Sequence, residues 1–133
     1  VKDYCDAITE NYKRDSIHSY ERMVEEDPEN TYAADRLNAI QNGTANLMKF
    51  DFTEGKKYYK IVQKEFRNGE YVSSSVHSFV GKAKDVLGNV YKPASWSAPH
   101  TKHVRFSFCD PTDFKNLLDP NFVGWAGGYL YIR

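Results

Sequence analysis

The hydrophobic pattern of the chain changes from helix-like to strand-like at Gly43, and this change limits the possible folds more than any other feature. Before Gly43, apolar residues recur every three or four positions, as on an amphipathic helix. Beyond it, apolar residues alternate with polar ones, as in a half-buried strand. Helices followed by strands predict an α+β fold, in which N-terminal helices pack on an antiparallel sheet.

The helical part is interrupted at a proline. Pro28 disfavours helical geometry at Asp27, so the first stretch, either one long helix or two short ones, should end there. A second helix is expected to begin near Thr31, which can cap it, and to end at Asn42-Gly43. We expect the apolar stripes of these helices to pack on the sheet, and the alternative is a face through which they dimerise.

The strand-like part predicts a curled antiparallel sheet of about five or six strands. Strands are expected over residues 48–52, 58–66, 71–80, 90–92, 104–108 and 129–132. Asn68-Gly69 favours a two-residue primed turn, so the strands on either side of it should form a hairpin. In the second hairpin strand, strict alternation places His77 and Phe79 on one face and Ser78 on the other.

Two prolines mark further boundaries in this part. Pro93 lacks a backbone donor and should end the strand over 90–92. Asp110-Pro111 provides a cap and a favourable first position for a short helix near residues 111–118. Because no linker-like or low-complexity stretch divides the chain, we expect a single domain over residues 1–133, mainly helical in 1–43 and mainly sheet in 44–133.

Charge and cysteine content exclude several classes of protein. The 18 Lys and Arg residues balance 18 Asp and Glu residues, so the chain lacks the overall basic field of an electrostatically driven nucleic-acid binder. No apolar run approaches the roughly 20 residues that cross a bilayer, so no membrane association is predicted. Cys5 and Cys109 lack metal-ligand spacing and are expected to be free thiols in a reducing compartment.

The sequence predicts neither a metal site nor a cofactor nor an enzyme. His100 and His103 have a spacing that suits a metal only on a helix, and Pro99 beside them argues against one. Cys109 could pair with His77 or His103 as a nucleophile, but its place at the end of a strand favours a small buried core residue.

Aromatic and basic residues gather between the two strands that surround Pro93. This candidate binding surface consists of Tyr91, Lys92, Trp96, His100, Lys102, His103 and Arg105. Such residues suit a protein partner, because Trp, Tyr and Arg dominate interface hot spots. They also suit single-stranded nucleic acid, whose bases stack on aromatic rings while cations meet its phosphates. The third interpretation is structural, with Trp96 folded inward as a plug of the sheet.

Residues 76–80, 88–96 and 98–105 resemble a segment of small uncharacterised proteins of tailed bacteriophages. The shared features are a His-aromatic-Val strand, a Gly turn, the run Tyr-Lys-Pro-Ala-Ser-Trp at 91–96 and a basic stretch. The closing Gly-Gly-Tyr-Leu-Tyr is similar too. The resemblance implies a viral origin and a location in the cytoplasm of an infected bacterium, without implying a mechanism.

The functional expectation is therefore a small phage-encoded accessory protein that binds, without catalysis, a host or phage protein through the Tyr91–Arg105 surface. Binding of single-stranded nucleic acid through the same surface is the first alternative, and its affinity should fall steeply with salt. A structural component of the virion is the second alternative.

Overall fold

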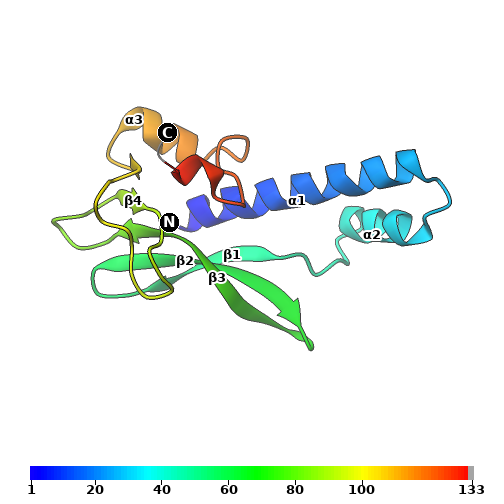
Figure 1. Cartoon of the computed structure of the whole chain (residues 1–133), viewed down its shortest axis with the longest axis horizontal. Coiled ribbons are helices and arrows are strands. Elements are labelled where there is room, and N and C mark those ends of the chain that lie inside the picture. Colours follow the sequence, from blue (N-terminus) through cyan, green and yellow to red (C-terminus); the bar gives the residue numbers. More distant parts are fainter. Residues whose placement is uncertain (132–133) are drawn as a thin grey trace.

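The computed structural model describes residues 1–131 and confirms the α+β fold (Figure 1). Its helices are α1 (Lys2–Glu26), α2 (Thr31–Gln41) and α3 (Pro111–Leu117), with a 3₁₀ turn, η1 (Gly128–Leu130), near the end. Its strands are β1 (Lys49–Glu54), β2 (Tyr58–Arg67), β3 (Glu70–Gly81), β4 (Asn89–Tyr91) and β5 (Phe106–Ser107). Consecutive strands are neighbours, in the order β1-β2-β3-β4-β5, and every pair is antiparallel.

Only the beginning of α1 packs against the sheet. Its buried residues, Tyr4, Cys5, Ala7 and Ile8, all lie in the first turns. The rest of α1 runs beyond the sheet and pairs with α2 as an antiparallel helical hairpin (Figure 1). The cap of α2 is Asn30 rather than Thr31, because the Asn30 side chain accepts a hydrogen bond from the Ala33 backbone N–H at 3.1 Å. Among residues 1–131, no helix has the length and apolarity to cross a membrane.

The β2–β3 hairpin forms around the predicted turn. Asn68 has φ 52° and Gly69 has φ 84°, the left-handed values that a primed two-residue turn requires. The two strands pair from Tyr58–Gly81 to Arg67–Glu70, and the pairing is irregular at two places. At these places β3 holds one residue more than β2, which bends and twists the hairpin.

One of these bulges overturns the predicted faces of β3. Ile61 pairs with Ser78 and Val62 pairs with Val76, so His77 is the extra residue. Because a bulge interrupts strict alternation, His77 and Ser78 both lie among core residues on the α1 side, while Phe79 packs against Tyr58 on the other face.

Residues 128–131 do not form the strand that alternation predicts over 129–132. Gly127 has φ 81° and turns the chain into η1, while Ile132 lies outside the described residues. Tyr129 contacts the rings of Phe106 and Phe122, and Leu130 is fully enclosed in the core. Apolar contacts on several sides of this segment therefore replace pairing along a sheet edge.

The region after β3 also differs in strand length. β4 covers only three residues and β5 only two, so the predicted strand over 104–108 is much shorter than expected. Pro93 follows the end of β4, as predicted. The helix near 111–118 is confirmed, because the Asp110 carboxylate accepts hydrogen bonds from the Thr112 and Asp113 N–H groups and Pro111 begins α3.

Candidate binding surface

The loop after β4 has a defined shape held by backbone hydrogen bonds. The N–H groups of Ala94 and Ser95 both donate to the Ala98 carbonyl, at 3.0 and 3.1 Å. At its base the His100 N–H donates to the Lys92 carbonyl at 2.7 Å. These bonds hold residues 92–100 as a braced projection, so the side chains at its tip are positioned before any partner binds.

Trp96 stands at this tip and is not a plug of the sheet. Its side chain is 49% exposed. The Lys60 ammonium group, on β2, lies 4.7 Å from the centre of the indole ring. This cation–π contact positions the ring over the face of the sheet opposite α1 and leaves much of it in contact with solvent.

Two of the predicted surface residues are structural instead. Tyr91 is only 4% exposed, because β4 pairs it with Phe79 and its ring packs edge-on against Tyr58. Arg105 holds the end of the chain: its Nε donates to the Leu130 carbonyl at 2.6 Å and its Nη1 to the His103 carbonyl at 2.8 Å. Neither side chain is free to serve as the recognition element that the sequence suggested.

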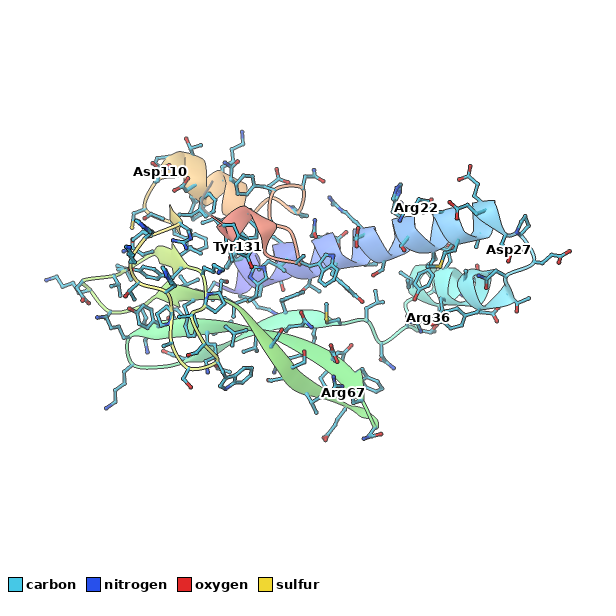
Figure 2. All side chains as sticks on the ribbon, viewed as in Figure 1. Arg22, Asp27, Arg36, Arg67, Asp110 and Tyr131 are labelled. Carbon is cyan, nitrogen blue, oxygen red and sulfur yellow. The ribbon has the colours of Figure 1, made fainter. Side chains whose placement is uncertain are left out.

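The other predicted residues lie on or near the loop. Lys102 and His103 are exposed, and His100 is half-buried with an Nδ1 that has no hydrogen-bond partner among the described residues. The Lys92 ammonium group lies 4.5 Å from the centre of the Tyr131 ring. Figure 2 shows Tyr131 over the sheet, far from Asp27 at the helical tip and from Arg67 at the hairpin end.

Two hollows lie beside the base of the loop. The Lys92 cavity, of about 310 Å³, is lined by Gln63, Ser75, Val76, His77, Lys92, Pro93, Trp125, Ala126, Gly127, Leu130 and Tyr131. The Trp96 groove, of about 340 Å³, is lined by Ser74, Ser75, Val76, Pro93, Ala94, Ser95 and Trp96. Both hollows are lined in part by Ser75, Val76 and Pro93, so both adjoin the same stretch of β3.

A buried hydrogen-bond chain begins at the wall of the Lys92 cavity. His77 Nε2 donates to the Gly124 carbonyl at 3.1 Å, so His77 Nδ1 accepts from the Ser78 hydroxyl at 3.1 Å. Ser78 Oγ in turn accepts from the Tyr4 hydroxyl at 3.2 Å, and Tyr4 accepts from Tyr129. His77, Ser78 and Tyr4 each donate one hydrogen bond and accept another, so the bonds run in one consistent direction from the Tyr129 hydroxyl to the Gly124 carbonyl.

Burial sets the protonation states of this chain. Desolvation lowers the pKa of His77 to about 4, against a smaller opposing effect of the Gly124 carbonyl. Desolvation also raises the pKa of Tyr4 to about 12 and that of Tyr129 well above its ordinary value. At neutral pH the side chains of this hydrogen-bond chain are therefore uncharged. Their bonds satisfy polar groups that are buried in the core.

A family described as "Family of unknown function (DUF7717)" matches residues 1–132. The chain belongs to this family. No curated protein and no solved structure matches it.

The two thiols of this family member differ in burial. Both are free, but Cys109 is exposed, contrary to prediction, while Cys5 is buried. Cys109 follows the end of the short β5, and its thiol donates to the Leu87 carbonyl at 3.6 Å. Burial raises the pKa of Cys5 to about 12. Within residues 1–131, no group of three His, Cys, Asp or Glu side chains is arranged to hold a metal ion.

Tyr4→Phe should lower the free energy of unfolding by about 2 kcal/mol. The change removes the hydroxyl that joins Ser78 to Tyr129 and leaves the buried Tyr129 hydroxyl without its acceptor. Chemical denaturation measures the effect. The matched change Tyr32→Phe, at a ring that is 65% exposed, should alter stability by less than about 0.5 kcal/mol. Equal effects of the two changes would contradict a stabilising role for the hydrogen-bond chain.

Proposed function

We propose that this protein is a non-catalytic binding protein that holds a protein partner through the Trp96 surface. This surface comprises Lys60, Lys92, Trp96, His100, Lys102 and His103. The observation that carries the proposal is the half-exposed Trp96 ring at the tip of a braced loop.

A protein partner accounts best for this arrangement. Large aromatic side chains supply much of the binding energy at protein interfaces, because a partner removes their apolar area from water. The loop is already held by its own hydrogen bonds, so its ordering costs little on association. The balanced charge of 18 basic and 18 acidic residues also favours a partner recognised by shape and apolar contact over a polyanion.

The hydrogen bonds of His77 and Cys109 support the non-catalytic part of the proposal. The His77 ring uses both of its nitrogens in structural hydrogen bonds. Cys109 bonds to a backbone carbonyl on the turn before β4. A nucleophile held against a general base, the usual arrangement for covalent catalysis, is therefore not formed by this pair.

Single-stranded nucleic acid is the second candidate, favoured by the cations around the Trp96 ring. Lys60 contacts the ring, and Lys102 is exposed on the same loop. A base could stack on the indole while these ammonium groups meet phosphates. Such binding would weaken steeply between low and physiological salt, whereas a largely apolar protein interface would change little.

The resemblance of residues 76–105 to tailed-phage proteins supports a biological setting for the proposal. We propose a phage-encoded accessory protein that meets a host or phage protein in the cytoplasm of the infected bacterium. Assembly into the virion is the alternative setting, and detection of the chain in purified particles would favour it.

Trp96→Ala tests the proposal directly. Because the ring is half exposed, the change should alter the free energy of unfolding by less than about 1 kcal/mol, while partner binding is lost. The measurement is capture of partners from infected-cell lysate with and without nuclease. The matched control is Phe114→Ala, which removes a ring that is 50% exposed on α3 and should retain the partner. A nuclease-sensitive partner would favour the second candidate, and equal capture by both variants would contradict the proposal.

A further inference from the structure

One edge of β3 is largely unpaired among the described residues. β2 pairs with β3 along its length, but on the other edge β4 pairs only with Phe79 and Val80. Pro93 then carries the chain away into the loop, so on this edge residues 70–78 have no strand paired with them within residues 1–131. Unpaired N–H and C=O groups along a strand form a template for another extended segment.

The two hollows lie on either side of this free edge. Gln63, which lines the Lys92 cavity, pairs with the core residue Phe50, so the cavity opens on the α1 face. The Trp96 groove lies on the opposite face, where the Trp96 ring contacts Lys60. Successive side chains of an extended strand point to opposite faces. A strand added here would therefore present neighbouring side chains to the cavity and the groove in turn.

The charge of the residues that line the two hollows indicates which side chains of an added strand would fit there. Lys92 is the one charged residue among those that line the cavity and the groove. The histidine in the cavity wall, His77, is neutral because of its burial. An anionic side chain in the cavity would meet the Lys92 ammonium group, and an apolar one in the groove would meet the Trp96 ring.

We propose that an extended segment of a partner protein adds to the free edge of β3, with an Asp or Glu side chain in the Lys92 cavity and an apolar side chain in the Trp96 groove. This inference rests on the proposed function, because it takes the partner to be a protein. Backbone hydrogen bonds to β3 provide affinity and the two hollows provide sequence preference.

The bulges of β3 favour a foreign segment over a second copy of the chain. Irregular pairing occurs beside Ser74 and His77, both within the free edge. A second copy would present the same twisted edge, and two such edges cannot form a long regular ladder. A flexible segment of another protein can follow the twist.

The test uses a displayed library of random peptides of about ten residues, long enough to span the free edge when extended. Peptides that bind are selected from this library with the full chain and with two charge-reversal variants, Lys92→Glu and Lys84→Glu. Lys84 is exposed on the turn before β4 and provides the matched control. The selected peptides then bind the full chain while backbone amide exchange is followed by NMR.

The wild-type chain and Lys84→Glu should both enrich peptides with an acidic residue at a fixed position. An apolar residue should lie an odd number of positions away from it, because such side chains point to opposite faces of an extended strand. Lys92→Glu should bind these peptides at least about tenfold more weakly and enrich basic residues instead. Amides of residues 73–76 should exchange more slowly in the complex.

Three results would overturn the inference. Peptides that protect only amides of the loop over 92–103 would exclude strand addition and leave the proposed function intact. The library could also yield no binders while the full chain still captures its partner through Trp96. That result would likewise exclude strand addition and leave the proposed function intact. Protection of residues 73–76 that rises with protein concentration alone would assign the edge to a second copy.

Discussion

Gly81→Ala should destabilise the fold by about 3 kcal/mol or more. Gly81 ends β3, and a Cβ atom there would lie 1.8 Å from the Val86 carbonyl oxygen and 2.6 Å from its carbon. Both are backbone atoms, so no side-chain rotation can relieve the overlap. The turn over 82–88 would have to move, although the Gly88 N–H is bonded to the Gly81 carbonyl at 3.0 Å.

Chemical denaturation of Gly81→Ala and Gly128→Ala would measure this effect. Gly128 has no atom within 4 Å of the position a Cβ would take, so its substitution should change stability by less than about 0.5 kcal/mol. If Gly81→Ala were as stable as Gly128→Ala, the close packing of the 82–88 turn on β3 would be wrong. That turn leads directly into β4, and so to the base of the binding loop.

Acidification from pH 7 to pH 4 should remove about 3 kcal/mol of stability through His77 alone. Burial lowers the native pKa of His77 from 6.5 to about 4, so between these values the unfolded chain binds a proton that the native chain does not. Stability from this group is therefore complete above pH 6.5 and is lost as the pH falls toward 4. The proton would also break the bond in which His77 Nδ1 accepts from Ser78.

His77→Gln isolates this contribution because glutamine does not titrate. The variant should lose about 3 kcal/mol less than the wild type over the same pH range, as measured by urea denaturation at each pH. His18→Gln makes the same change at an exposed position of α1 and should retain the wild-type loss. Equal pH dependence in the His77 variant and the wild type, or an NMR titration of His77 near pH 6.5, would show that the ring is not buried as described.

Local sequence patterns predicted the elements of the fold well. The period change at Gly43 separates the helices from the sheet, Asn68-Gly69 forms the primed turn, and Asp110-Pro111 begins α3. These features depend on residues that are neighbours in the chain. Pattern and turn chemistry therefore suffice for them.

The candidate site was predicted only in part. The run over 92–103 is the exposed loop, and Trp96, Lys102 and His103 lie on its surface. Tyr91 and Arg105, at its two ends, are held by partners far away in the chain: the Tyr58 ring and the Leu130 carbonyl. The free edge of β3 also escaped prediction, because it depends on how few residues β4 contributes to pairing.

The sequence alone determined where most of the helices, strands and tight turns occur, because backbone preferences and hydrophobic period act over a few residues. Only the tertiary structure decided that His77 joins Ser78, Tyr4 and Tyr129 in the core, and that the last segment is a 3₁₀ turn instead of a strand. It also decided that Trp96 faces solvent. These outcomes depend on bulges and on contacts between segments that are distant in the chain. The free energy of burying a side chain depends on which segments pack around it, and local sequence does not specify this.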